Sequence, residues 1–175
     1  MAQLIVLTGF RATGKTAVGR HLARRLGWDF LDTDAELTAR MGCSIAELVR
    51  QQGWEFFREQ ERRLLHELAG RRNVVLATGG GAILHQREWE HLRRSAVVVW
   101  LRTDLAATLA RLRQDEHTAG QRPRLHEEAA DWEEETAALL AEREPLYQVG
   151  SDLVIDTAGK RAEELAELIF NITIL

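Results

Sequence analysis

Apolar residues form five short, continuous runs along the chain, and longer amphipathic stretches separate these runs. The runs cover residues 3–8, 28–32, 74–77, 96–101 and 153–156. Runs this short, without strict alternation of apolar and polar positions, are typical of strands that are covered on both faces. They therefore predict five buried strands.

The amphipathic stretches carry apolar residues at the spacing of one helix face. They cover residues 15–26, 44–52, 54–69, 104–113, 130–143 and 162–170. The second begins with Ser44 and has Glu47 three residues later, which is the pattern of a capping box. Pro145 is expected to stop the helix that precedes it. Because strands and helices take turns, we expect βαβ units around a parallel sheet, in the class of α/β folds.

The composition narrows the class of protein without indicating an activity. A chain of 175 residues with 45% hydrophobic residues fits one compact domain, residues 1–175. The net charge of -4 argues against a nucleic-acid-binding protein, which usually presents a strongly basic face. Cys43 is the single cysteine, so no internal disulfide can form, and no apolar segment approaches the length of a membrane span. We therefore expect a cytoplasmic protein without nucleic-acid or membrane partners.

Residues 9–16, GFRATGKT, match the P-loop pattern GxxxxGK[ST] between a predicted strand and a predicted helix. In such loops, backbone N–H groups and the start of the following helix bind phosphate oxygens. Lys15 can reach the β- and γ-phosphates, and the Thr16 hydroxyl can bind Mg²⁺. Ala12 stands where many such loops have another glycine, which indicates a backbone dihedral angle that alanine can adopt. The predicted nucleotide-binding residues of this loop are Gly9, Ala12, Thr13, Gly14, Lys15 and Thr16.

Acidic residues follow the second predicted strand rather than a later one. The apolar run at 96–101 is followed by Arg102, so the usual Walker B aspartate is absent from it, whereas Asp32 and Asp34 lie at the end of the run at 28–32. Residues two apart in an extended chain face the same way, so both carboxylates can line the crevice beyond the strand ends. One can hold Mg²⁺ through water and the other can bind a substrate hydroxyl. This placement favours a small-metabolite kinase, although both acids could instead cap a helix, with Asp34 the N-cap.

Three further groups fit an anionic acceptor. Arg58 and Glu61 are three residues apart in a predicted helix, where Arg58 could bind a carboxylate while Glu61 steadies it, or the two could form a solvated ion pair. Gly79, Gly80 and Gly81 suit a ligand lying against bare backbone, or a plain flexible turn. Arg143 can add a second cation, although an arginine near the end of a helix is favourable without a ligand.

Residues 117–128 have no clear periodicity and lie between two predicted helices. Connections of this length without structure of their own are often functional lids, and the alternative is a mobile surface loop.

Taken in order, these motifs resemble the shikimate kinase family from residue 4 to about residue 157. The segments that carry the resemblance are GFRATGKT, DTD, GWEFFREQE, GGGA, RPRL and REPLY. The resemblance implies transfer of the γ-phosphoryl group of ATP to the 3-hydroxyl of shikimate, a step in aromatic amino-acid biosynthesis. It implies a three-layer α/β/α P-loop fold like that of nucleoside-monophosphate kinases, with strand order 2-3-1-4-5. It also implies a substrate-binding segment at 34–62 and a lid at about 112–126.

The same resemblance implies roles for individual residues. Shikimate would be held by Asp34, Arg58, Gly79, Gly80, Gly81 and Arg143. Asp32 would help Thr16 to hold Mg²⁺. Arg122 would reach the phosphates from the lid, and Arg111, or with less support Arg113, would lie near the adenine. Lys15, Asp34 and Arg122 would be the catalytic residues.

Two positions depart from the family pattern. Trp54 follows Gly53 where a small or acidic residue is expected, and Arg124 replaces a leucine in the lid, which leaves open which arginine meets the phosphate. ATP and shikimate are the expected partners, and a monomer is expected. Two other functions stay open: a kinase for another small hydroxy acid, such as gluconate, and a non-catalytic nucleotide-binding regulator.

Overall fold

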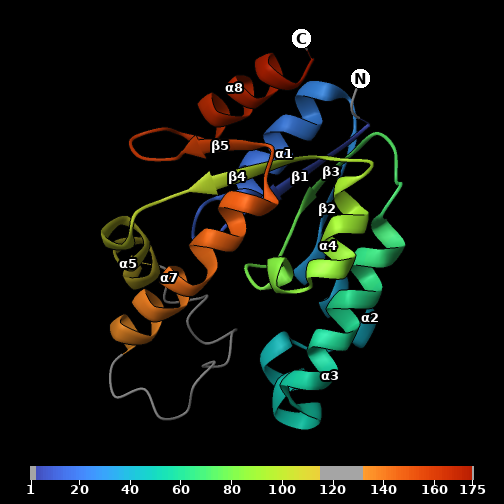
Figure 1. The fold of residues 1–175 in the computed structure, drawn as a ribbon, viewed down its shortest axis with the longest axis vertical. Coiled ribbons are helices and arrows are strands. Elements are labelled where there is room, and N and C mark those ends of the chain that lie inside the picture. Colours follow the sequence, from blue (N-terminus) through green and yellow to red (C-terminus); the bar gives the residue numbers. More distant parts are fainter. Residues whose placement is uncertain (1–2, 115–131, 175) are drawn as a thin grey trace.

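The computed structural model describes residues 3–114 and 132–174. Its centre is a five-stranded sheet with the order β2-β3-β1-β4-β5, and every pair of neighbouring strands is parallel (Figure 1). The strands are β1 (Leu4–Thr8), β2 (Asp29–Asp32), β3 (Val74–Ala77), β4 (Val97–Arg102) and β5 (Leu153–Asp156). Both the five strands and their order agree with the sequence prediction.

The two sides of β1 face two separate apolar cores. Leu4 and Val6 belong to one core cluster, whereas Ile5 and Leu7 belong to the other, because successive side chains of a strand point to opposite faces. β1 and β3 are buried along their whole length, while the edge strands β2 and β5 are partly exposed. The expectation that every strand is covered on both faces therefore holds for the centre of the sheet only.

Helices cover both faces of the sheet and give three layers (Figure 1). On the side of Ile5 and Leu7, α1 (Lys15–Leu26) packs against α8 (Ala162–Ile174). The core on the opposite side includes residues of α2, α3, α4 and α7. These helices are α2 (Thr33–Met41), α3 (Ile45–Leu68), α4 (Gln86–Arg93) and α7 (Trp132–Gly150). A 3₁₀ turn, η1 (Ala82–Leu84), follows β3, and α5 (Leu105–Gln114) follows β4.

α3 begins and bends where the sequence indicates. Ser44 and Glu47 form the predicted capping box. Gly53 has φ 83° and ψ 167°, which breaks the helix between the two predicted stretches. Because this conformation is almost restricted to glycine, Gly53 sets the direction in which Trp54 and the rest of α3 leave the bend.

α7 does not end before Pro145, so that prediction is wrong. The helix continues to Gly150 with the proline inside it. A proline in a helix removes one backbone hydrogen bond, but Tyr147 and Gly150 anchor the turns that follow it to the rest of the protein. Tyr147 is fully buried, and the Gly150 carbonyl accepts a hydrogen bond from Trp89 Nε1 at 2.9 Å.

α2 and α4 were not predicted from the sequence. Only Thr33 and Leu37 of α2 are buried, and only Trp89 and Leu92 of α4, so neither helix has a full apolar stripe. Most of the expected lid, including Arg122 and Arg124, falls outside the described residues. Among the described residues, no helix combines the length and apolar character that crossing a lipid bilayer requires.

Candidate active site

The P-loop lies between the end of β1 and the start of α1, as predicted. Gly9, Ala12 and Gly14 have φ angles of 139°, 59° and 86°. For Ala12 this is the left-handed region, which alanine adopts at a cost of about 1–2 kcal/mol. The glycine common at this position would adopt it more easily. The Ala12 carbonyl accepts a hydrogen bond from Arg111 Nη1 at 3.0 Å, which fixes one side of this loop.

Lys15 lies inside the curve of the loop. Its Nζ donates to the carbonyls of Gly9 and Phe10 at 2.8 and 2.6 Å, and the Thr13 hydroxyl lies 3.3 Å away. The Thr13 hydroxyl also donates to the Phe10 carbonyl. The ammonium group is therefore held at the place where the loop backbone turns.

Thr16 and Asp32 meet across the start of α1 and the end of β2. Thr16 Oγ1 donates to Asp32 Oδ2 at 2.7 Å. Asp32 Oδ1 accepts from the backbone N–H groups of Asp34 and Ala35, so Asp32, rather than Asp34, is the N-cap of α2. A hydroxyl and a carboxylate oxygen side by side are suitable ligands for a hard divalent cation. Because the described residues contain no cluster of three acidic, histidine or cysteine ligands, phosphate or water oxygens would have to complete such a site.

Arg111 and Arg113 lie in different surroundings. Arg111 Nη1 lies 3.0 Å from the Ala12 carbonyl and 3.5 Å from Thr157 Oγ1, between the P-loop and the turn after β5. Arg113 pairs with Glu133 on α7 and is mostly exposed. Of the two candidates for the adenine side, Arg111 is the one that contacts the P-loop.

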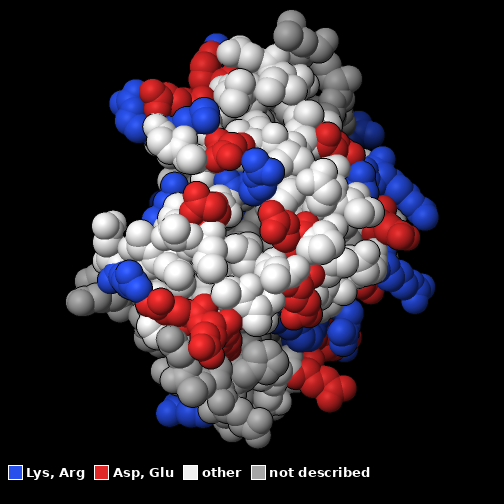
Figure 2. Space-filling view, turned by 60° about the vertical axis from the view of Figure 1, so that its left-hand side comes forward, with Lys and Arg blue, Asp and Glu red and all other residues white. Residues whose placement is uncertain are grey.

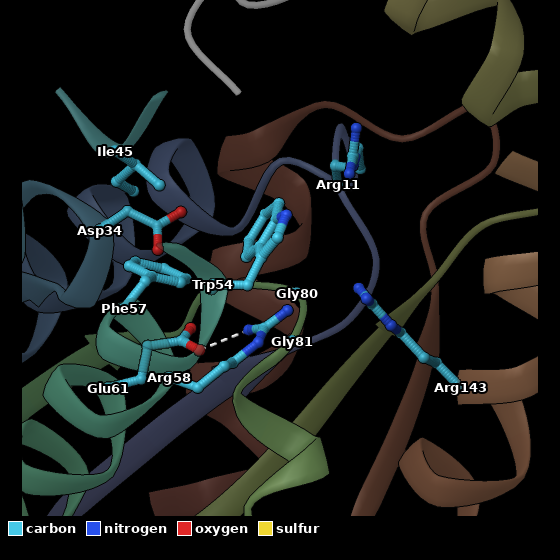
Figure 3. Close-up of a pocket in the computed structure, with 11 residues that line it drawn as sticks. Arg11, Asp34, Ile45, Trp54, Phe57, Arg58, Glu61, Gly80, Gly81 and Arg143 are labelled. Carbon is cyan, nitrogen blue, oxygen red and sulfur yellow. Dashed lines mark hydrogen bonds and ion pairs between the residues drawn. The ribbon is translucent and has the colours of Figure 1, made fainter. Parts of the chain in front are cut away.

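A pocket opens beside the P-loop at the carboxyl ends of β1, β2 and β3 (Figure 3). It combines cations, acids, an apolar wall and a bare glycine turn, so its lining suits a small anionic molecule with hydroxyl groups. The lining residues are Arg11, Asp34, Ile45, Trp54, Phe57, Arg58, Glu61, Gly79, Gly80, Gly81 and Arg143.

Arg58 reaches the pocket from α3 and is held there by two kinds of contact. Its Nη1 donates to Glu61 Oε2, the bond drawn in Figure 3. The guanidinium also lies 5.3 Å from the Trp54 ring and 5.4 Å from the Phe57 ring. Glu61 is only 4% exposed and also contacts His85. The alternative of a solvated ion pair is therefore wrong.

The three glycines after β3 are needed because side chains approach their backbone closely. None of them has a positive φ. A Cβ at Gly79 would lie 2.6 Å from Asp34 Oδ1, and one at Gly81 would lie 2.3 Å from Arg58 Nη1. The backbone N–H of Gly79 donates to Thr33 Oγ1 at 2.9 Å. A plain flexible turn does not explain this close fit.

Arg143 reaches the pocket from α7, opposite Arg58 (Figure 3). It is 4% exposed, and its Nε makes no hydrogen bond to the described residues. Its guanidinium carbon lies 5.8 Å from the centre of the Phe10 ring. Since α7 continues for two further turns, Arg143 is not an arginine that stabilises a helix end.

Arg11 and Tyr147 belong to this site but were not identified from the sequence. Arg11 lines the pocket from the P-loop. The Tyr147 hydroxyl donates to the Gly80 carbonyl at 2.5 Å, and its ring stacks on Trp100. Burial raises the pKa of Tyr147 to about 12. The four-residue spacing from Arg143 to Tyr147 places both on one helix face, and this was the available sequence signal.

Acidic and basic side chains are mixed over the face of the molecule drawn in Figure 2. Among the described residues, this face therefore shows no extended basic surface.

A family model described as shikimate kinase matches residues 11–173 of this chain. A shikimate kinase from Nitratidesulfovibrio vulgaris is 48% identical over 144 residues, which cover 82% of this chain and 80% of that protein. A solved structure of shikimate kinase from Acinetobacter baumannii in complex with shikimate has a TM-score of 0.90 at 36% identity, covering 99% of this chain and 94% of that one. Deoxyadenosine kinase from M. mycoides, with a TM-score of 0.62 at 14% identity and coverage of 98% and 100%, shares the fold alone.

Proposed function

The chain belongs to the shikimate kinase family, and from that premise we propose that it transfers the γ-phosphoryl group of ATP to the 3-hydroxyl of shikimate. The products are 3-phosphoshikimate and ADP, in the pathway to chorismate and the aromatic amino acids. The observation that carries this proposal is the pocket beside the P-loop, which Arg58, Arg143 and Asp34 line together with a glycine turn. This arrangement suits an acceptor that has a carboxylate at one end and hydroxyl groups at the other.

On the donor side, we assign the phosphates to the P-loop and the adenine to Arg111. The phosphate-binding residues are Gly9, Ala12, Thr13, Gly14, Lys15 and Thr16. Lys15 balances the charge that develops on the transferred phosphoryl group. Its hydrogen bonds to the carbonyls of Gly9 and Phe10, which hold the ammonium group inside the P-loop, support this role. From the resemblance alone, we add Arg122 to the residues that bind the phosphates, and we place it in a lid at about 112–126. We assign the whole chain, residues 1–175, to a single kinase domain.

Mg²⁺ is the divalent cation we propose for this site. The adjacent oxygens of Thr16 and Asp32 support this choice, with Asp32 acting through water. When bound, the cation neutralises charge on the β- and γ-phosphates.

On the acceptor side, we assign the carboxylate of shikimate to Arg58 and Arg143, because guanidinium groups can bind carboxylates in bidentate geometry. Asp34 binds the ring hydroxyls, and Gly79, Gly80 and Gly81 give the ring a surface of bare backbone. Asp34 and Arg58 belong to the proposed substrate-binding segment 34–62, and the three glycines lie beyond it. The 3-hydroxyl oxygen forms a bond to the γ-phosphorus as the bond to the ADP oxygen breaks, and Asp34 accepts the hydroxyl proton late in the transfer.

We further propose that the protein acts as a cytoplasmic monomer, without nucleic-acid or membrane partners. The single cysteine, Cys43, supports the cytoplasmic compartment. The net charge of -4 supports the absence of a nucleic-acid partner.

Substitution of Asp34 tests the proposed chemistry. Asp34→Asn keeps the size of the side chain but removes the carboxylate, so kcat for shikimate phosphorylation should fall by about 100-fold or more. Lys15→Met should cause a loss of similar size. Asp29→Asn, at the exposed start of the same strand, is the matched control and should keep wild-type activity. Near-wild-type turnover by either Asp34→Asn or Lys15→Met would contradict the assignment.

A further inference from the structure

His85 lies directly behind the pocket, next to the ion pair that faces the acceptor. It stands between η1 and α4 and does not line the pocket itself. Its Nε2 lies 3.1 Å from Glu61 Oε2, and the side chains of His85 and Glu61 are 5% and 4% exposed. Both groups are therefore shielded from water, where a polar group needs a partner.

The direction of this hydrogen bond follows from the chemistry of its partners. Glu61 pairs with the guanidinium of Arg58, and an ionised carboxylate only accepts hydrogen bonds. His85 Nε2 therefore carries a hydrogen and donates a hydrogen bond to Oε2. The same oxygen accepts from Arg58 Nη1, so one carboxylate oxygen joins the histidine to the arginine.

The position of His85 in the fold is not explained by a role in starting α4. His85 is the N-cap residue of that helix, where serine, threonine, aspartate and asparagine are preferred. Its side chain makes no hydrogen bond to the helix N–H groups. The helix start thus lacks a side-chain cap, and the imidazole is directed at Glu61.

The backbone from Gly79 to His85 surrounds the ion pair. A Cβ at Gly79 would lie 3.3 Å from Glu61 Oε1, so this oxygen faces the start of the turn. Gly81 lies against the Arg58 guanidinium, and His85 contacts the other oxygen of Glu61 after the short η1 turn. The same segment that forms the floor of the pocket therefore also fixes the carboxylate behind it.

We propose that His85 is a positioning residue for the acceptor: it fixes the Glu61 carboxylate, which in turn holds the Arg58 guanidinium toward the carboxylate of shikimate. This inference rests on the proposed function, which assigns Arg58 to that carboxylate. Without the donor at His85, the buried Glu61 carboxylate would accept a second N–H from Arg58. That movement would take the guanidinium away from the pocket.

The test compares steady-state constants for variants that keep or lose the donor. His85→Leu should raise KM for shikimate by about tenfold, which is the effect of losing one hydrogen bond to a charged group. KM for ATP should change less than about twofold, since the P-loop is untouched. His85→Gln places an amide N–H near the position of Nε2 and should keep KM for shikimate within about threefold of wild type. His91→Leu, an exposed position on the same helix, should leave both constants unchanged.

A double-mutant cycle checks that the effect passes through Glu61. In a Glu61→Gln background, adding His85→Leu should change KM for shikimate by less than about twofold, because the connection is already broken. An equal rise in both backgrounds would overturn the proposal, and so would a His85→Gln variant as weak as His85→Leu. If His85→Leu does not fold, His85→Asn replaces it, because its shorter side chain cannot carry the donor to Glu61.

Different results would contradict the proposed function and the role of His85. A wild-type protein that does not phosphorylate shikimate contradicts the proposed function and this inference with it. Wild-type turnover with the same KM for shikimate in every His85 variant overturns the role of His85 alone.

Discussion

Tyr147 makes a buried hydrogen bond beside the pocket. Its ionisation can be measured directly, because it is the single tyrosine in the chain. Its ordinary pKa of 10.0 rises to about 12, chiefly because burial disfavours the phenolate. The near-ultraviolet absorbance of tyrosinate should therefore be small for the folded protein at about pH 11 and should rise strongly when denaturant unfolds the chain at the same pH. Ionisation of the folded protein near pH 10 would contradict this environment.

The same shift in pKa makes the stability depend on pH. Since the unfolded chain loses this proton near pH 10 and the folded protein holds it, the contribution of Tyr147 is complete below pH 10. It should fall steadily as the pH rises above 10 and should be lost, by about 3 kcal/mol in all, once the pH passes 12. Tyr147→Phe should lose this part of the pH dependence, as measured by denaturant unfolding, and should be less stable at neutral pH because the buried Gly80 carbonyl loses its partner.

Gly81 is predicted to be intolerant of a methyl group because of Arg58. In Gly81→Ala the added Cβ would lie 2.3 Å from Arg58 Nη1, while the backbone itself has no positive φ. Arg58 must therefore move, and KM for shikimate should rise by about 10- to 100-fold, the range expected for a disturbed hydrogen bond to a charged group. KM for ATP serves as the internal control. A shikimate KM equal to that of wild type would contradict the placement of Arg58.

At this scale the sequence identified the residues of the site better than their contacts. Asp32 was recognised as a functional acid, but its role as the N-cap of α2 depends on where that helix begins. Glu61 was expected to steady Arg58, whereas its burial and its bond to His85 depend on the turn after β3. Such contacts join residues far apart in the chain, and local spacing carries no signal for them.

At the scale of elements, the bend in α3 orients one wall of the pocket. Gly53→Ala should destabilise the protein by about 1–3 kcal/mol, because φ 83° and ψ 167° strain any residue with a Cβ. The space is not limiting, since nothing lies within 4 Å of an added Cβ. KM for shikimate should also rise, because Trp54 and Arg58 leave the bend in a new direction.

Gly27→Ala provides the matched control for this bend. Gly27 also has a positive φ, of 67°, and open space around an added Cβ, but it ends α1 away from the pocket. It should lose stability in thermal unfolding while keeping KM for shikimate. A rise in KM for both variants would show that general destabilisation, rather than the bend, is responsible.

The success of the sequence prediction varied with the packing of each element. The strands were found because the central ones are wholly buried and therefore continuously apolar. α2 and α4 were missed because each buries few residues, and α7 passed through Pro145 because its last turns pack on Trp89. Tertiary burial decided these cases, and single-sequence patterns do not contain it.

At the scale of the molecule, strand order explains why sequence motifs far apart come together. β2, β3 and β1 are neighbours in the sheet. Asp34, in the first turn of α2, directly follows β2, the three glycines follow β3, and the P-loop follows β1. Ligands of parallel α/β sheets bind at this end of the strands, so the grouping was predictable once the order was known. The positions of Arg58, Arg143 and Tyr147 depend instead on how α3 and α7 pack. Arg11 lies in the P-loop, at a position that the loop pattern leaves open to any residue.

The most direct test of the central claim is ADP release by the purified protein with ATP and Mg²⁺, with and without shikimate. We expect ADP to appear together with an equal amount of 3-phosphoshikimate, whereas gluconate or no acceptor should give little more than background. ATP binding without acceptor-dependent ADP release would indicate a nucleotide-binding regulator. Faster ADP release with gluconate than with shikimate would contradict the assignment of the acceptor pocket.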